Sequence, residues 1–254
     1  MRSDVLIIGG GPTGLVLALW LTKLGVKVRI IDKTAEPSTT SRALAVQART
    51  LELYRQLDLA DAVVEQGHRV PAVNLWVKGE PATRLPFETI GSDLTPYAFL
   101  QIFPQDQHER LLIERLEALG VSVERRSELV GFTDEGDGVT ARLRGPEGRE
   151  DSCEMRYIAG CDGARSLVRE TIGTGFPGGT YRQIFYVADV EAAGPALMST
   201  WMRPISWRSF PSPGRVARGS SGPCATSVPT APTHSGSRTS AIGQSITSRS
   251  RSKG

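Results

Sequence analysis

A glycine-rich turn between an apolar run and a helical stretch is the feature that most constrains this chain. The apolar run Val5-Leu6-Ile7-Ile8 predicts a short, buried, parallel β-strand. It leads directly into Gly9-Gly10-Gly11-Pro12-Thr13-Gly14, which matches the pattern G-x-G-x-x-G at Gly9, Gly11 and Gly14. The turn therefore predicts the start of a dinucleotide-binding unit.

The residues after this turn complete the same unit. The apolar stretch Leu15 to Leu24 predicts a helix, and Gly25 stands where helices commonly end. A second strand, Val26 to Ile31, leads to Asp32 and Lys33, and the acid follows the last glycine of the turn by roughly twenty residues.

Each residue type in this unit has a physical role in nucleotide binding. Gly9 permits the tight turn, Gly11 allows a pyrophosphate to approach the backbone, and Gly14 allows the helix to pack closely on the strand. The helix N-terminus offers N–H groups and a positive dipole end to phosphates. Asp32 is able to accept hydrogen bonds from both hydroxyls of a ribose and would repel a 2′-phosphate. The alternative is a glycine-rich turn with a structural role alone.

Length and composition restrict the class of protein. The chain has 254 residues, enough for one large or two modest domains. We expect no membrane span, because no segment has the apolar length that a bilayer crossing requires. We expect no signal peptide, because the first apolar run begins at Val5 and is interrupted by glycines. The three cysteines, Cys153, Cys161 and Cys224, show no C-x-x-C spacing, so we expect no disulfide framework and no metal site. These features favour a cytoplasmic protein.

The charges are distributed unevenly along the chain. Residues 1–191 contain 22 basic and 27 acidic side chains, whereas residues 192–254 contain 8 basic and no acidic ones. The C-terminal segment is also rich in serine, threonine and proline, so we expect residues 204–254 to form a disordered tail. A shifted reading frame after about residue 200 would explain the change in composition. The alternative is a basic linker that contacts nucleic acid or membrane, but the segment lacks the aromatic interleaving and the lysine density typical of nucleic-acid binding.

The middle of the chain alternates between helical and strand patterns. A loop and helix are expected over 41–59, and short strands over 70–100. The remaining expected elements are a helix that starts near Gln105, a strand over 121–124, a hairpin of 129–133 with 139–143, a strand over 155–159 and a helix over 167–172. His68 and His108 lie outside any acid–base constellation, and we expect them to be exposed or at the edge of the core.

The order of these elements predicts an α/β fold with two interleaved domains. The sheet that begins near residue 4 is expected to resume near residue 155, after a long excursion. We therefore expect a Rossmann-like nucleotide-binding domain over 1–175. Residues 68–100 are expected to be inserted as part of a β-rich substrate domain. Residues 176–203 would begin a second, incomplete segment of that domain.

Three stretches of the chain together resemble the FAD-dependent aromatic hydroxylases, which are single-component flavoprotein monooxygenases. The first is the glycine turn with Asp32, and the second comprises 41–52 together with Leu100-Gln101-Ile102-Phe103-Pro104-Gln105. The third is Ala159-Gly160-Cys161-Asp162-Gly163-Ala164-Arg165-Ser166. The resemblance covers residues 3 to roughly 200.

This resemblance implies FAD as cofactor and NADH or NADPH as co-substrate. It implies that the Rossmann-like domain over 1–175 is an FAD/NAD(P)-binding domain of the GR2 type. It implies that Asp32 holds the adenosine ribose, that Arg42 lies near the flavin and its phosphates, and that Gln101 contacts the ribityl–flavin region. The alternatives are a surface-loop Arg42, a solvated Gln101, and an Asp162 that caps a helix and pairs with Arg165 or Arg169. The expected cofactor-binding residues are Gly9, Gly11, Pro12, Thr13, Gly14, Asp32, Lys33, Arg42, Gln101, Asp162, Gly163 and Arg165.

The implied reaction is hydroxylation of a small aromatic, phenolic or polyketide-type substrate with NAD(P)H and dioxygen. No catalytic side chain is assigned, because this chemistry belongs to the flavin. We expect no nucleic-acid partner, and the oligomeric state is not indicated. The alternatives are another FAD/NAD(P)-dependent oxidoreductase of the same superfamily and a non-catalytic, partial FAD-binding module.

One family feature is absent from this sequence. Members of the family carry a later G-D-x-x-H-type motif whose aspartate contacts the ribityl chain, and no such motif follows residue 190. We therefore expect this chain to bind FAD weakly and to have little or no hydroxylase activity.

Overall fold

The structure is a computed structural model of residues 1–254. It describes residues 3–39, 43–70, 72–77, 80–87, 91–179, 186–190, 198–202, 205–211 and 217–221. The chain divides into two compact units: one comprises Met1–Arg69 and Thr89–Gly179, and the other comprises Val70–Glu88 and Thr180–Gly254. The domain boundaries expected from the sequence remain predictions.

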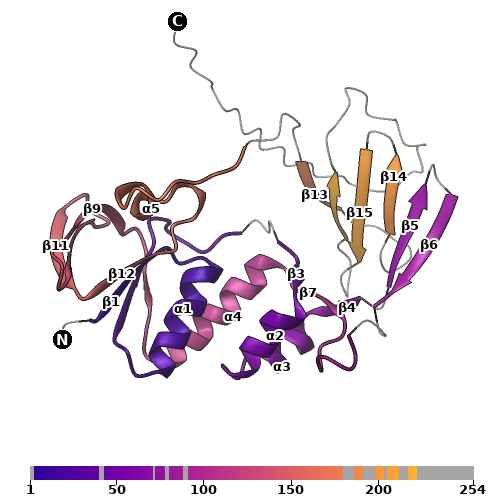
Figure 1. The fold of residues 1–254 in the computed structure, drawn as a ribbon, viewed down its shortest axis with the longest axis horizontal. Coiled ribbons are helices and arrows are strands. Elements are labelled where there is room, and N and C mark those ends of the chain that lie inside the picture. The colour runs from indigo at the N-terminus through magenta and orange to yellow at the C-terminus, as the bar shows by residue number, and fades with distance from the viewer. Residues whose placement is uncertain are drawn as a thin grey trace, which may run out of the picture. The chain divides into compact units, whose positions relative to one another are not determined.

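The first unit is built on a parallel sheet with the strand order β12-β1-β2-β8 (Figure 1). Its strands are β1 (Val5–Ile8), β2 (Val28–Ile31), β8 (Val123–Glu124) and β12 (Tyr157–Gly160). Strand β12 pairs in parallel with β1, Tyr157 opposite Val5 and Gly160 opposite Ile8. The prediction that the sheet resumes near residue 155 is therefore confirmed.

One detail of that prediction was wrong. The single strand expected over 155–159 is two strands, because Met155 ends β11 and β12 begins at Tyr157. Between them, the backbone N–H groups of Arg156 and Tyr157 both donate to the carbonyl of Asp4, each at 3.1 Å. These two hydrogen bonds mark the point where the chain passes from the sheet that contains β11 to the parallel sheet that contains β12.

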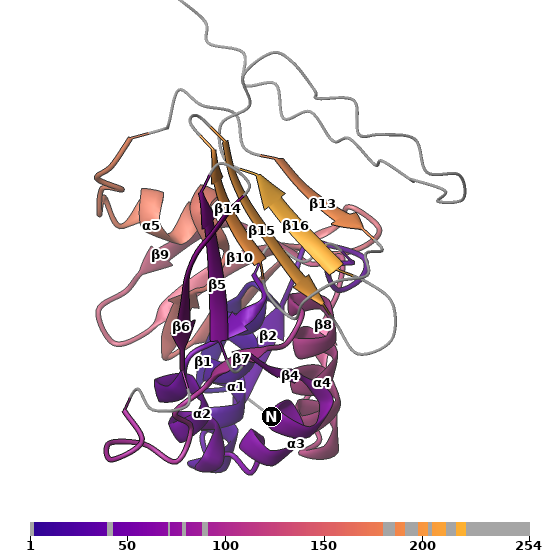
Figure 2. The same ribbon diagram turned by 90° about the vertical axis from the view of Figure 1, so that its right-hand side faces the viewer.

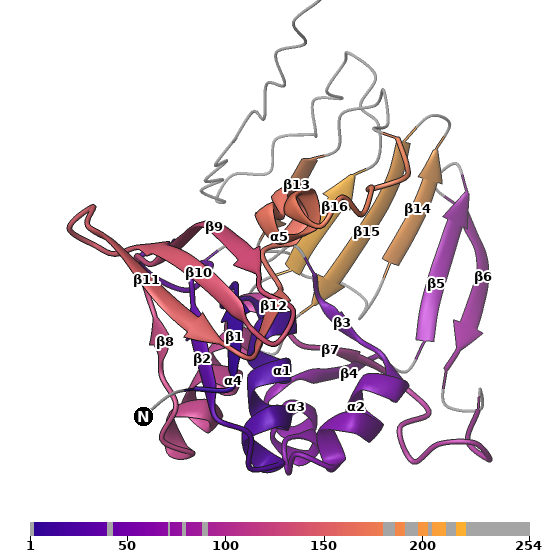
Figure 3. The same cartoon turned by 60° about the vertical axis from the view of Figure 1, so that its left-hand side comes forward.

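One face of the parallel sheet shares its core with four helices. They are α1 (Pro12–Lys23), α2 (Ala48–Arg55), α3 (Ala60–Gln66) and α4 (Gln105–Ala118). Helices α1 and α4 lie side by side in Figures 1 and 3. Val5 and Ile7 belong to the core on this face, together with Leu15 and Leu19 of α1 and Leu112 of α4.

The opposite face of the sheet packs against an antiparallel sheet and a short helix (Figure 3). These elements are β9 (Glu128–Asp134), β10 (Val139–Arg144), β11 (Glu150–Met155), the 3-10 turn Gly163–Arg165 and α5 (Leu167–Thr171). Leu6 and Ile8 belong to this second core, as alternation along a strand requires. The expected hairpin of 129–133 with 139–143 is confirmed as the β9–β10 pair.

Two further sheets complete the described structure. The small sheet has the order β3-β7-β4, formed by β3 (Ala45–Val46), β7 (Leu100–Ile102) and β4 (His68–Val70). The six-stranded sheet of Figure 2 has the order β13-β16-β15-β14-β5-β6. Its strands are β5 (Ala72–Val77), β6 (Glu80–Pro86), β13 (Tyr186–Val190), β14 (Met198–Met202), β15 (Ile205–Pro211) and β16 (Ala217–Ser221).

Strands β15 and β16 fall within the segment for which the sequence predicts a disordered tail. Each pairs antiparallel with its neighbour, Trp207 opposite Ser221 and Pro211 opposite Ala217. For these residues the structure differs from the prediction, because a backbone ladder satisfies N–H and C=O groups without a strong apolar pattern. Residues 222–254 lie outside the described residues, as does Arg42.

A partly buried polar pair joins helices α2 and α4. The hydroxyl of Tyr54 lies 2.8 Å from Nε2 of His108, and the two rings meet edge to face with centroids 5.4 Å apart. Burial raises the pKa of Tyr54 to about 12 and lowers the pKa of His108 to about 4. Both side chains are therefore neutral near pH 7, and His108 belongs to the core edge as expected.

Replacing Gly14 with alanine should destabilise the fold. A Cβ at Gly14 would lie 1.9 Å from the carbonyl oxygen of Gly9, so helix α1 would have to move away from the turn. We expect Gly14→Ala to lower the free energy of unfolding by at least about 2 kcal/mol in urea denaturation. Gly11→Ala is the matched control, because its Cβ would meet nothing within 4 Å. Equal stability of the two variants would contradict this account of the packing.

The His108 pKa predicts how stability depends on pH. Because the folded-state pKa is about 4 and an unfolded histidine titrates near 6.5, the unfolded chain binds more protons between these values. The free energy of unfolding therefore has its full contribution from neutral His108 above pH 6.5. It falls by up to about 3 kcal/mol as the pH is lowered to 4.

Comparison of urea denaturation at pH 4.5 and 7.5 measures this loss. His108→Gln keeps a neutral hydrogen-bonding side chain, so its stability should fall less between the two pH values than that of the unaltered chain. His68→Gln, which removes a different histidine, is the control. An equal loss in the unaltered chain and His108→Gln would refute the assignment.

Candidate functional site

The glycine turn is held by close backbone contacts. Gly9 has φ +109°, and its N–H donates to the carbonyl of Ile31 at 2.8 Å. A Cβ at Gly9 would lie 2.3 Å from the carbonyl oxygen of Cys161, in the loop after β12. Gly9 and Gly14 are thus required by the packing, as the sequence predicts.

Gly11 differs from these two glycines because its surroundings are open. It has an extended backbone at the N-cap of α1, and a Cβ there would meet nothing within 4 Å. Pro12 and Thr13 follow in the first helical turn, which contains no acidic residue and has no side-chain cap on its N–H groups. The open backbone and the positive helix end suit an anion such as a pyrophosphate.

Asp32 lies at the carboxyl end of β2, beside this turn. Its Oδ2 accepts a 2.6 Å hydrogen bond from the N–H of Gly10, and its Oδ1 accepts from the N–H and hydroxyl of Thr34 at 2.7 and 2.6 Å. Burial opposes the charge, but these hydrogen bonds and the nearby Arg125 outweigh it and hold the pKa of Asp32 below its ordinary value. Lys33, the next residue, is exposed.

The structure adds Arg125, which the sequence analysis missed. Its Nη1 lies 3.9 Å from Oδ1 of Asp32 and donates to the hydroxyl of Thr34 at 3.3 Å. The side chain is 18% exposed, and a Cβ at Gly10 would lie 3.3 Å from Nη1. No local pattern links Arg125 to Asp32, because the pairing of β2 with β8 brings them together.

The predicted loop of Asp162, Gly163 and Arg165 lies against the glycine turn. The N–H of Cys161 donates to the carbonyl of Ile8 at 2.7 Å, which fixes the loop at the end of β1. Oδ2 of Asp162 accepts from the N–H of Leu167 at 2.7 Å, so this oxygen caps the start of α5. Gly163 has φ +77° and is exposed, as is Arg165.

One carboxylate oxygen of Asp162 is able to accept a further hydrogen bond. Its Oδ1 is buried and has no hydrogen-bond partner within the described part of the chain. Arg169 does not pair with it among these residues, because its guanidinium donates to the carbonyls of Gly163 and Ala164 at 3.2 and 2.7 Å. Asp162 thus caps a helix through Oδ2, as the alternative expects, while its Oδ1 is left to accept from a further donor.

The two glutamines of the second motif have different surroundings. Gln101 is fully buried, and its Nε2 donates to the carbonyl of Val63 at 2.9 Å near the end of α3. Gln105 is the first residue of α4, and its Nε2 donates to Oε1 of the buried Glu109 at 2.8 Å. Gln105 also lines a cavity beside α1, whereas Gln101 does not.

That cavity has a volume of about 450 Å³ and lies at the start of α1. Its walls come from Pro12 and Thr13, from residues 43–47, from helix α2 and from the first turn of α4. The carbonyls of Ala43 and Leu44 accept hydrogen bonds from the N–H groups of Gln105 and Phe103, which tie residues 43–47 to the start of α4. The cavity therefore adjoins the open backbone at Gly11.

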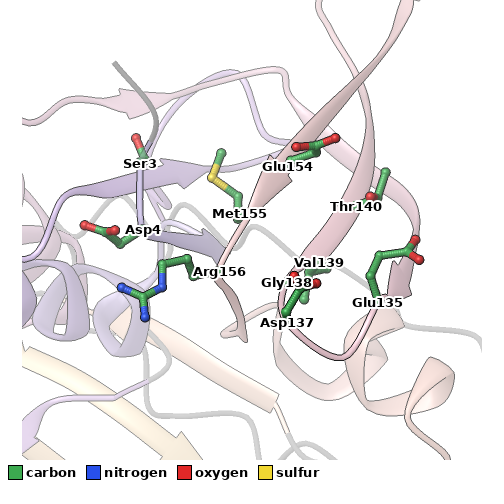
Figure 4. A pocket seen from close by; sticks show the side chains of 10 residues that line it. All are labelled: Ser3, Asp4, Glu135, Asp137, Gly138, Val139, Thr140, Glu154, Met155 and Arg156. Carbon is green, nitrogen blue, oxygen red and sulfur yellow. The ribbon is translucent and has the colours of Figure 1, made fainter.

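A more polar hollow of about 370 Å³ lies elsewhere in the same unit, and Figure 4 shows its side chains. It is lined by Asp4, Glu135, Asp137, Glu154 and Arg156, among others. Asp4 precedes β1, so this hollow lies at the amino end of the strand. Nucleotides bind at the carboxyl ends of parallel strands, so we do not assign it to the cofactor.

The described residues contain no group of three or more His, Cys, Asp or Glu side chains that could hold a metal ion. Within the same part of the chain, no helix combines the length and the apolar character needed to cross a membrane.

Comparison with known proteins identifies relatives of this chain. Residues 2–249 match the FAD binding domain family, so the match continues past residue 200, where the sequence resemblance was expected to stop. The 6-methylpretetramide 4-monooxygenase of Streptomyces rimosus is 38% identical over 218 residues, which are 84% of this chain and 39% of that protein. The chain spans about two fifths of the length of such relatives.

Solved structures agree with this match. Aklavinone-11 hydroxylase, solved with FAD and aklavinone, superposes with a TM-score of 0.74 and 27% identity, covering 87% of this chain and 45% of that one. The p-nitrophenol 4-monooxygenase of Pseudomonas putida shares the fold, with a TM-score of 0.81 and 23% identity over 89% of this chain and 59% of that one. The chain therefore belongs to the FAD binding domain family, that of the FAD-dependent aromatic hydroxylases.

Proposed function

We propose that this chain forms the FAD-binding part of an NAD(P)H-dependent monooxygenase that hydroxylates aromatic or polyketide-type substrates. The observation that supports this proposal best is the open backbone of Gly11 beside the ionised Asp32, both at the carboxyl edge of the parallel sheet. A dinucleotide needs a phosphate site and a ribose site at this edge. The substrate class follows the relatives, one of which is a pentachlorophenol 4-monooxygenase of Sphingobium chlorophenolicum.

The residues at this edge fit FAD chemically. In the proposed complex, the pyrophosphate lies over Gly11 and receives hydrogen bonds from the first turn of α1, where Pro12 and Thr13 line the adjoining cavity. Asp32 accepts from the adenosine ribose, and the unpartnered Oδ1 of Asp162 accepts from another part of the cofactor. Lys33, Gly163 and Arg165 remain candidates because all three are exposed.

For the second motif we propose Gln105 as the glutamine that faces the cofactor. The buried Gln101 holds the end of α3 through Val63, so a flavin contact would require that bond to break. Gln105 lines the cavity at the start of α1 and is steadied by Glu109. The role of Arg42 stays a prediction.

When bound, FAD supplies the redox chemistry, which is oxidation of NAD(P)H and activation of dioxygen. The protein's own groups bind and orient. The glycine turn fixes the cofactor's phosphates, and Asp32 holds its ribose, while the walls of the cavity beside α1 line the bound cofactor. No described side chain is assigned a proton transfer.

We further propose a cytoplasmic location.

A substitution at Gly11 tests the cofactor site. We expect Gly11→Ala to weaken FAD binding at least about tenfold, because its Cβ would occupy the space that the pyrophosphate needs. Isothermal titration calorimetry with FAD measures this change, and an unaltered melting temperature would show that the fold is intact.

Gly175→Ala is the matched control, because its Cβ also meets nothing within 4 Å but lies after α5, away from the turn. It should leave FAD binding unchanged. Equal FAD affinities for the Gly11 and Gly175 variants would argue against a pyrophosphate at Gly11. Hydroxylation of a phenol coupled to NADH oxidation by this chain alone would overturn the expectation of little or no activity.

A further inference from the structure

The carboxylate of Asp32 is nearly saturated by the protein's own donors. A carboxylate has about four lone-pair sites for hydrogen bonds. Thr34 donates twice to Oδ1, through its backbone N–H at 2.7 Å and its hydroxyl at 2.6 Å. Gly10 donates to Oδ2 at 2.6 Å. The donors in the described part of the chain therefore leave one acceptor site on Asp32 for a ligand.

A ribose offers two neighbouring hydroxyls, so its full recognition by Asp32 needs a second site. The backbone donors cannot leave without distorting the main chain, because the N–H of Gly10 belongs to the glycine-rich segment and the N–H of Thr34 to the bend two residues after Asp32. The hydroxyl of Thr34 is different, since it changes its acceptor by rotating a single bond.

The Thr34 hydroxyl has a second acceptor within reach. Its Oγ1 lies 2.9 Å from the carbonyl oxygen of Glu36 and 2.6 Å from Oδ1 of Asp32. A hydroxyl carries one hydrogen, so it donates to only one of these at a time. Nη1 of Arg125 donates to the same Oγ1 at 3.3 Å, and this leaves the hydroxyl hydrogen free to point toward either acceptor.

We propose that Thr34 is an exchangeable donor that fills the ribose site of Asp32 in the free protein and turns to Glu36 when a ribose binds. This inference rests on the proposed binding of FAD at Asp32. Before binding, the Thr34 hydroxyl fills an acceptor site of the partly buried Asp32 carboxylate that the backbone donors leave empty. On binding, a ribose hydroxyl replaces it, and the Thr34 hydrogen is satisfied by the Glu36 carbonyl.

The exchange makes ribose binding weaker than it would be without Thr34. A hydrogen bond to a charged acceptor is stronger than one to a neutral carbonyl, so turning from Asp32 to Glu36 costs free energy. Thr34 is exposed, and water reduces the difference. We expect Thr34→Val, which has no hydroxyl, to bind FAD about threefold more tightly than the unaltered chain.

Calorimetric titration of FAD into the unaltered chain and three variants tests this expectation. Thr34→Ser keeps the hydroxyl and should bind as the unaltered chain does. Thr171→Val is the matched control, because it removes an exposed threonine hydroxyl that donates to the carbonyl of Leu167, in α5. If Thr34 instead only braced Asp32, Thr34→Val would bind FAD more weakly, and that result would overturn the proposal, as would unchanged affinity.

A second measurement separates exchange from a general effect of the substitution. With 2′-deoxy-ADP or 3′-deoxy-ADP as probe, only one ribose hydroxyl remains, and the one vacant site on Asp32 suffices for it. The gain from Thr34→Val should therefore appear with ADP and vanish with at least one deoxy probe. An equal gain with all three probes would overturn the exchange. If the unaltered chain bound neither FAD nor ADP, the proposed function itself would fail.

Discussion

The close approach of helix α1 to the end of β1 is the contact on which the rest of the site depends. Alanine at Gly14 would place its Cβ 1.9 Å from the Gly9 carbonyl oxygen, and alanine at Gly9 would place its Cβ 2.3 Å from the Cys161 carbonyl oxygen. Three backbone segments thus meet without an intervening side chain. Their meeting aims the first turn of α1 at the carboxyl edge of the sheet and brings the Asp162 loop to the same place.

The adenosine side of the site depends on backbone hydrogen bonds that continue past the ends of β2 and β8. Asp32 N–H donates to the carbonyl of Glu124 at 2.9 Å, and Ser127 N–H donates to the carbonyl of Asp32 at 3.0 Å. Arg126, with φ +55°, donates its N–H to the carbonyl of Thr34 at 3.1 Å. These bonds hold Arg125 beside Asp32, although 93 positions separate them, so the local charge balance is set by sheet register.

The elements that could be predicted from the sequence are those whose formation depends on residues close together in the chain. Val5–Ile8, the glycine turn, the helix from Gln105 and the β9–β10 hairpin follow from apolar runs, turn residues and periodicity. Arg125 could not be predicted, because only the β2–β8 pairing places it. Gln101 and Gln105 are equally polar in sequence, and only the fold separates a buried residue from one that lines a cavity. The serine- and proline-rich composition after residue 203 predicted disorder, although Ile205 and Trp207 alternate with polar residues in β15.

The hydrogen-bond donors around Asp32 also influence which nucleotide binds at the carboxyl edge of the parallel sheet. Gly10 and Thr34 are neutral donors, so they stabilise the charge of Asp32 without cancelling it. Arg125, at 3.9 Å, offsets that charge only in part, since an ion pair at this separation and partial exposure is weak. The negative potential that remains opposes a 2′-phosphate, while the acid-free first turn of α1 attracts a pyrophosphate. Both preferences are met by an adenosine with free ribose hydroxyls, as in FAD.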